Sequence, residues 1–123
     1  MRMPKIAISA ISAVAVLLSG SLVAPSIVIA GDASAVEEGQ KIAFHRKKGN
    51  CLACHAIKGG KLPGNIGPPL ENMQQRFPDK SKLKAQIWDA TVANPYSIMP
   101  PFGKYKILSD KELDEVVEFI YSL

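Results

Sequence analysis

The chemistry of this chain is concentrated in the segment Asn50–His55, whose sequence is NCLACH. This segment contains both cysteines of the 123-residue chain and one of its two histidines. Two thiols at this spacing can form a redox dithiol, contribute to a metal site, close a small disulfide or attach a cofactor covalently. The rest of the sequence helps to decide among these four interpretations.

Three of the four interpretations fit the sequence poorly. A thioredoxin-like dithiol expects a βαβ setting, and no convincing strand is predicted. A structural zinc site takes four ligands, yet only His45 remains beyond Cys51, Cys54 and His55. A disulfide across two intervening residues would stabilise little. The pattern C-x-x-C-H is typical of haem c attachment, in which Cys51 and Cys54 form thioethers and His55 becomes the proximal iron ligand.

The N-terminal segment predicts export. Two basic residues precede a long uncharged apolar run, and small residues follow that run. We therefore expect residues 1–30 to be a signal peptide cleaved after Ala30, with residues 33–35 as a second cleavage site. The run is long enough to span a bilayer, so a retained membrane anchor is the alternative. Either interpretation places residues 31–123 outside the cytoplasm, and periplasmic export is the prediction.

The exported part, residues 31–123, makes one small and weakly basic domain. Its net charge falls from +4 to about +2, because two basic residues and no acidic ones leave with the signal. Nucleic-acid binding is not expected, since there is no basic stripe with interleaved aromatic residues. Two neighbouring cysteines cannot staple a domain of this size, whose core would be marginal by itself. One covalent haem c would supply the missing apolar core.

Hydrophobic periodicity predicts an all-α fold of about three to four helices and long loops. The first helix is expected over residues 35–47, with acidic residues in its first turn, basic residues at its end and Gly49 as its C-cap. The second is expected over about residues 80–92, with Asp79 capping its N-terminus.

The last helix is the most strongly predicted of the three. Ser109 and Glu112 form a capping box before an apolar face of period 3.6. Between the predicted helices, residues 57–78 are rich in Gly and Pro, with at most a turn of helix around residues 70–76. Residues 96–108 are expected to form an ordered loop.

Three residues are candidates for a second iron ligand: Met73, Met99 and His45. Met99 precedes two prolines, which hold a weak thioether ligand in place at low entropic cost. Met73 is better explained as core filler, and His45 as a solvated surface residue. A pair formed by His55 and Met99 would raise the haem potential and leave no open site for a substrate, so electron transfer is the expected chemistry.

The segments CLACH and IGPPL, a Met in a late loop and the C-terminal amphipathic helix resemble the class I cytochrome c family. The resemblance implies that the carbonyl of Pro68 accepts a hydrogen bond from His55, and that Leu70 packs on the proximal face of the haem. It also implies that the first and last helices cross at a glycine–aromatic contact, formed by Gly39, Phe44 and Phe119.

A more specific resemblance covers residues 37–123. The segments GNIGPPL, RFPDKSKLKAQIWDAT and MPPFGKYKIL resemble the SoxX family, the monohaem subunit of the SoxAX cytochromes of sulfur oxidation. In that family a SoxA partner carries the catalytic haem, and the complex joins thiosulfate oxidatively to a cysteine of the carrier SoxYZ. The resemblance implies a periplasmic heterodimer in which this chain accepts electrons and is not an enzyme by itself. A free-standing periplasmic electron shuttle is the alternative.

Several basic residues fall near the segments expected to rim the haem. They would steer an acidic partner toward the haem edge, or they form an ordinary solvated surface, and the sequence leaves both interpretations open. These residues are Arg46, Lys47, Lys48, Lys58, Lys61, Lys104 and Lys106.

Overall fold

The computed structural model describes residues 30–123. The predicted signal peptide, residues 1–30, therefore lies outside the described residues except for its last position. Within the described range the chain is helical, as predicted, and its one β-type pairing there is an isolated parallel bridge between Ile57 and Leu70. The elements are α1 (Ala30–Phe44), η1 (Cys51–Ala53), α2 (Met73–Arg76), α3 (Lys80–Trp88), η2 (Ala90–Val92) and α4 (Asp110–Tyr121).

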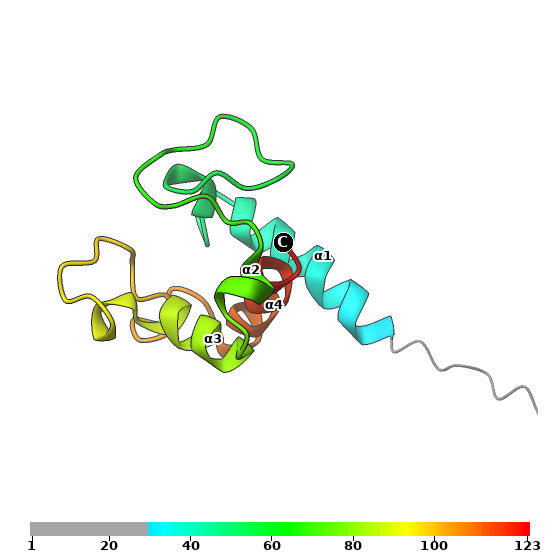
Figure 1. The fold of residues 1–123 in the computed structure, drawn as a ribbon. Coiled ribbons are helices and arrows are strands. Elements are labelled where there is room, and N and C mark those ends of the chain that lie inside the picture. The colour runs from blue at the N-terminus through cyan, green and yellow to red at the C-terminus, as the bar shows by residue number, and fades with distance from the viewer. Residues whose placement is uncertain (1–29) are drawn as a thin grey trace, which may run out of the picture.

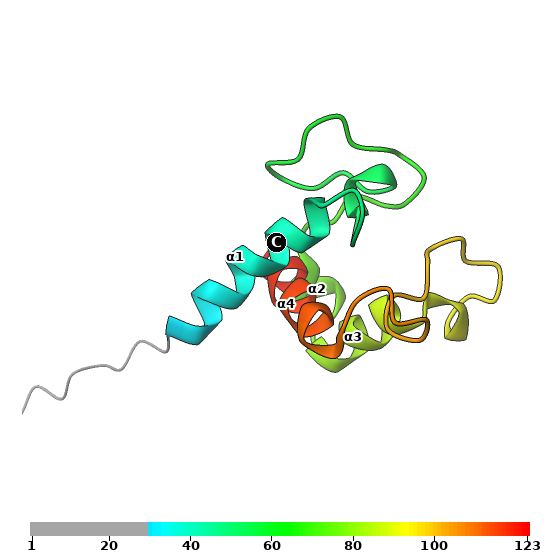
Figure 2. The ribbon, with the colours of Figure 1, turned by 180° about the vertical axis from the view of Figure 1, so that it is seen from behind.

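Helices α1 and α4 cross closely, and this crossing forms the centre of the fold (Figures 1 and 2). A Cβ added to Gly39 would lie 1.9 Å from the backbone oxygen of Glu115, so only glycine permits this approach. Next to it the rings of Phe44 and Phe119 meet edge to face, with centroids 5.7 Å apart. The predicted glycine–aromatic contact is confirmed.

Helix α4 supplies the apolar face on which the other elements pack. Its N-terminus has the predicted capping box, since Ser109 Oγ accepts from the N–H of Glu112 and the Glu112 carboxylate accepts from the N–H of Ser109. The side chains that α4 buries come from one side of the helix and from its end: Leu113, Val116, Val117, Phe119 and Ile120. Around them lie buried apolar residues from α1, α2, α3 and the loops, among them Ala43, Met73, Leu83 and Leu108.

The first predicted helix is correct in kind and wrong at both ends. Helix α1 begins at Ala30 and ends at Phe44, so its predicted span of residues 35–47 is shifted toward the N-terminus. The chain leaves the helix in a tight turn, in which the N–H groups of His45 and Gly49 both donate to the carbonyl of Ile42. Gly49 is therefore not a C-cap next to the last helical residue, and the basic residues before it lie in the turn.

The second predicted helix ends earlier than expected. Helix α3 starts after the predicted Asp79 cap, whose side chain accepts from the N–H of Ser81. It stops at Trp88, because Asp89 adopts an extended backbone and uses its carboxylate to cap the short segment η2. A helix predicted over residues 80–92 is thus two elements joined at one aspartate.

Two long loops extend from the helical body (Figures 1 and 2). One joins η1 to α2, and the other joins η2 to α4. The one-turn helix predicted around residues 70–76 is α2, and the predicted ordered loop over residues 96–108 is confirmed. No helix within residues 30–123 is long and apolar enough to cross a membrane.

Candidate functional site

A cavity of about 760 Å³ lies between the two long loops and the helical body. This volume falls within the range of cofactor pockets. Its lining brings together segments that are distant in the sequence, including Cys51, Cys54, His55 and Met99. Much of the remaining lining is apolar and comes from α2, α3, α4 and the loops, for example Leu70, Leu83, Ile87, Phe102, Val116 and Ile120.

The imidazole of His55 is oriented by the backbone. Its Nδ1 lies 2.7 Å from the carbonyl oxygen of Pro68. A carbonyl only accepts hydrogen bonds, so Nδ1 carries the proton of the neutral ring and Nε2 keeps a lone pair for a metal ion. Gly67 makes room for the ring, because a Cβ there would lie 2.3 Å from His55 Cε1.

The loop that carries Pro68 is held beside the cysteine segment by the main chain. The N–H of Gly67 donates to the carbonyl of Cys54 at 2.8 Å, and the N–H of Leu70 donates to Ala56 at 2.9 Å. Pro68 lies between these two bonds. The position of its carbonyl is therefore set by backbone pairing on both sides, and Leu70 is brought to the cavity wall by the same pairing.

The two cysteines lie at the start of this site and are not joined by a disulfide. Cys51 opens η1 after Asn50, which has a left-handed backbone with φ of 46°. Burial raises the pKa of the Cys51 thiol to about 11. Because the thiolate is the reactive form in thiol–disulfide exchange, a thiol of raised pKa does not favour the redox dithiol. Among the described residues no group of three or more His, Cys, Asp or Glu side chains could hold a metal ion, which does not favour the zinc site.

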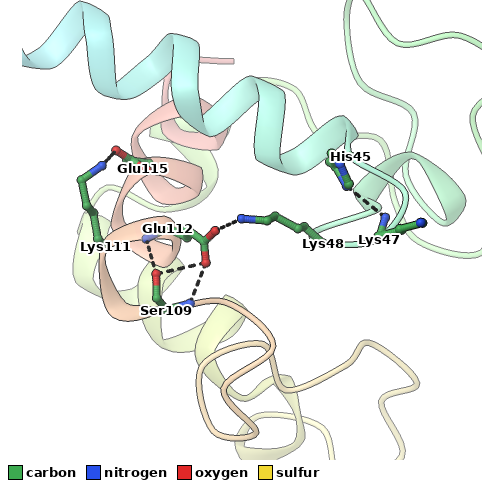
Figure 3. A network of polar contacts seen from close by, with 7 residues as sticks. All are labelled: His45, Lys47, Lys48, Ser109, Lys111, Glu112 and Glu115. Carbon is green, nitrogen blue, oxygen red and sulfur yellow. Dashed lines mark hydrogen bonds and ion pairs between the residues drawn. The ribbon is translucent and has the colours of Figure 1, made fainter.

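Of the three candidates for a second ligand, Met99 is the one that fits. Met99 is half-buried, lines the cavity and comes from the loop after η2, whereas His55 comes from the other long loop. Met73 also lines the cavity but is 1% exposed, and its Sδ lies 3.3 Å from Arg76 Nη1. His45 is exposed and does not line the cavity; its Nδ1 accepts from the N–H of Lys47 (Figure 3).

The predicted basic residues divide into groups in the structure. Arg46, Lys47 and Lys48 line the cavity. Two of the others form ion pairs away from the lining, Lys104 with Asp89 and Lys106 with Asp110.

A polar network ties the segment before the cysteines to α4 (Figure 3). The ammonium of Lys48 pairs with the carboxylate of Glu112, which also accepts from Ser109. These donors hold the pKa of Glu112 at about 2. Sequence inspection missed this pair because its members are 64 positions apart, and no local pattern links them.

Residues 34–120 match the family described as cytochrome c oxidase, cbb3-type, subunit III. The chain belongs to this cytochrome c family. A relative, an uncharacterized lipoprotein of Aquifex aeolicus (strain VF5), is 32% identical over 76 residues, or 61% of this chain. The match covers 37% of that relative, so this chain spans little more than a third of its length.

Family membership makes this a haem c domain with an electron-transfer function, and it favours an extracytoplasmic location. The cavity fits such a group on the chemistry of its own residues. It offers two thiols at the attachment spacing, a histidine with Nε2 available, a thioether and an extensive apolar wall. A haem packed against this apolar wall would complete the core of so small a domain.

Proposed function

We propose that Cys51 and Cys54 attach haem c through thioethers and that His55 and Met99 are the axial ligands of its iron. The hydrogen bond from His55 Nδ1 to the Pro68 carbonyl carries this proposal, since it leaves Nε2 available for the iron. Pro68 and Leu70 then form the proximal shell. The bound haem supplies one-electron transfer, and the polypeptide holds the ligands, excludes water and sets the potential.

We further propose that this chain is the electron-accepting subunit of a periplasmic SoxAX complex. Support comes from segments whose resemblance to SoxX goes beyond the haem ligands. The segment RFPD ends in Asp79, the N-cap of α3, and IWDA contains Trp88 and Asp89 at the other end of that helix. The segment MPPFGK packs against this second end through Gly103 and Lys104. A free-standing shuttle has no evident need for this combination.

The proposed reaction requires an electron acceptor of this kind. Joining thiosulfate to a cysteine thiol forms a sulfur–sulfur bond and releases one proton and two electrons. Cys51 and Cys54 are the only cysteines of the chain, so it has no further thiol for catalysis. Its proposed partners are therefore a SoxA-type cytochrome in a heterodimer, the carrier SoxYZ as substrate of the complex, and a downstream cytochrome that receives the electrons.

The charge distribution supports a docking role for the loop side of the domain. Residues 39–70 and 90–109 contain basic residues and no Asp or Glu. Lys41, Lys48, Lys104 and Lys106 of these stretches form ion pairs, whereas the side chains of Arg46, Lys47, Lys58 and Lys61 form none among the described residues. Exposed apolar side chains lie in the same two loop regions, among them Leu62, Ile66, Tyr96 and Ile98. An acidic partner would be steered to this side and would then cover its apolar residues.

The test is gentle affinity purification of the protein from its host grown with thiosulfate. A second c-type cytochrome in equal amount, in a preparation that couples thiosulfate to a protein thiol, would support the SoxAX assignment. Recovery of a single haem protein that only exchanges electrons with soluble partners would favour the free-standing shuttle. The family match supports the electron-transfer role that both assignments share, and its description names no sulfur chemistry.

A further inference from the structure

One buried carboxylate is bound to both arms of the loop that carries Met99. Asp89 is 2% exposed and stands between α3 and η2, where the chain leaves the helical body. Burying a carboxylate costs folding free energy unless hydrogen-bond donors surround it. The donors around Asp89 therefore identify the segments that it holds in place. Its two oxygens have different partners, which lie in different parts of the loop.

The first oxygen holds the outgoing arm. Oδ1 of Asp89 accepts from the N–H of Thr91 at 3.0 Å and also from the Thr91 hydroxyl, which caps η2. From η2 a chain of local hydrogen bonds continues toward Met99. The N–H of Ser97 donates to the carbonyl of Asn94 at 2.9 Å, and the N–H of Met99 donates to Ser97 Oγ at 3.3 Å.

The second oxygen holds the returning arm. Oδ2 of Asp89 accepts from Lys104 Nζ at 2.7 Å. The N–H groups of Gly103 and Lys104 both lie 3.2 Å from the carbonyl of Trp88. The indole of Trp88 lies directly against Gly103, because a Cβ there would fall 1.9 Å from Trp88 Cδ1. Met99 is linked to this arm through two prolines, which transmit the position of the arm with little freedom.

We propose that Asp89 is a positioning residue for the Met99 thioether. By dividing its oxygens between Thr91 and Lys104, it closes the loop at its base and keeps Met99 at the cavity. This inference rests on the proposed ligation of the iron by Met99. It adds that the strength of this ligation depends on a carboxylate outside the cavity lining.

The ion pair is suited to this task because one partner is buried. Removing Lys104 would leave the Asp89 carboxylate buried with fewer donors, and such losses cost more than the loss of a surface pair. The neighbouring pair between Lys106 and Asp110 has side chains 71% and 80% exposed, and pairs of that kind contribute little. It therefore provides a matched control in the same loop.

The experiment compares Asp89→Asn and Lys104→Gln with the control Lys106→Gln in the haem-loaded full chain. Two readouts are used: the near-infrared absorption band of methionine bound to ferric haem, and the apparent affinity for added imidazole. A loosened loop exposes the iron more often, so we expect imidazole to bind about tenfold more tightly to both test variants. Lys106→Gln should stay within about twofold of wild type, and Lys104→Arg should restore the wild-type values.

The outcomes distinguish a failure of Met99 ligation from a failure of the positioning role of Asp89. A wild-type protein without the methionine band would overturn Met99 ligation and this inference with it. A wild-type band with equal imidazole affinities in all variants would overturn only the role of Asp89. If Asp89→Asn fails to fold, Lys104→Gln still decides, because it leaves the carboxylate in place as the cap of η2.

Discussion

At the scale of single residues, the structure assigns different tasks to chemically similar groups. His55 is held by a backbone carbonyl at 2.7 Å with its Nε2 available, whereas His45 is exposed and accepts a backbone N–H. Met99 is half-buried at the cavity, whereas Met73 is 1% exposed and part of the core. The local environment of each side chain, and not its type, separates the proposed iron ligands from the other candidates.

Replacing Met99 by alanine is expected to lower the haem reduction potential sharply and to let ferric iron bind added imidazole or cyanide. The reason is that a thioether ligand favours the reduced iron and blocks the sixth coordination site. Potentiometric titration measures the first effect and optical titration the second. Met73→Leu is the matched control, because it removes the other thioether that lines the cavity while conserving its volume, and the potential should change far less than in Met99→Ala. An unchanged potential in Met99→Ala would exclude Met99 as the ligand.

The single-residue features differ in how well the sequence predicts them. The C-x-x-C-H spacing points to haem attachment without any structure, and the prolines after Met99 mark it as the better methionine. The role of Asp89 could not be predicted in the same way. An aspartate after a helical pattern resembles an ordinary helix end, and its partner Lys104 follows only 15 positions later, in a loop without periodicity.

At the scale of elements, the crossing of α1 and α4 limits what position 39 can hold. Gly39→Ala would place a methyl group 1.9 Å from the backbone oxygen of Glu115. A side-chain rotation cannot relieve this clash, so the two helices themselves must move apart. We expect a loss of about 1–3 kcal/mol in the free energy of unfolding, measured by denaturant titration of the haem-loaded protein. Glu37→Ala on the exposed side of α1 is the control and should change stability by about 0.5 kcal/mol or less. Equal stability of the two variants would contradict close packing at the crossing.

The network at the start of α4 predicts a pH dependence. The pKa of Glu112 lies at about 2 in the folded protein against an ordinary value of 4.5, so its carboxylate is stabilised by folding. Its contribution is present above about 4.5 and is lost as the pH falls toward about 2, where the folded-state carboxyl becomes protonated. Glu112→Gln should therefore be less stable than wild type at neutral pH, and the difference should shrink on acidification.

The measurement is denaturant unfolding of wild type and Glu112→Gln at a series of pH values. Asp114→Asn is the control, because the pair of Asp114 with Lys84 is at the surface, with side chains 57% and 47% exposed. That variant should show only a small effect at any pH. A stability difference for Glu112→Gln that does not change with pH would show that Glu112 acts by packing and not by its charge.

Helix existence was predictable from the sequence, and helix ends were less so. The capping box of α4 is local and was found directly. The ends of α1 and α3 are set by contacts that do not appear in the hydrophobic periodicity. Helix α1 ends in a turn whose N–H groups donate to the carbonyl of Ile42, and α3 ends where the Asp89 carboxylate accepts from Lys104. Tertiary contacts override the local helix propensity where α1 and α3 end.

At the scale of the whole molecule, the cavity lies beside basic residues of which only some are paired with acidic ones. Arg46, Lys47 and Lys48 line the cavity, and neither adjoining stretch, residues 39–70 or 90–109, contains an acidic residue. Lys48 and Lys106 pair with acidic residues of α4, and Lys104 pairs with Asp89. The positive charge that forms no ion pair among the described residues therefore comes from Arg46, Lys47, Lys58 and Lys61. The net charge is small, but the charges are unevenly distributed over the surface. Rates of electron exchange with charged partners should therefore depend on the charges near the cavity more than on the net charge.

This distribution can be tested with charged oxidants of simple shape. Lys47→Glu reverses a charge at the cavity, and Lys82→Glu makes the same change on an exposed part of α3 outside the cavity lining. With ferricyanide, an anion, Lys47→Glu should slow oxidation of the ferrous protein by roughly two- to tenfold at low ionic strength and weaken the salt dependence. Lys82→Glu should have a smaller effect. With a cationic cobalt complex the Lys47 variant should react faster, because attraction replaces repulsion. Equal effects of the two substitutions would show that only net charge matters, and the proposal of a cationic docking side would fail while the haem assignment stood.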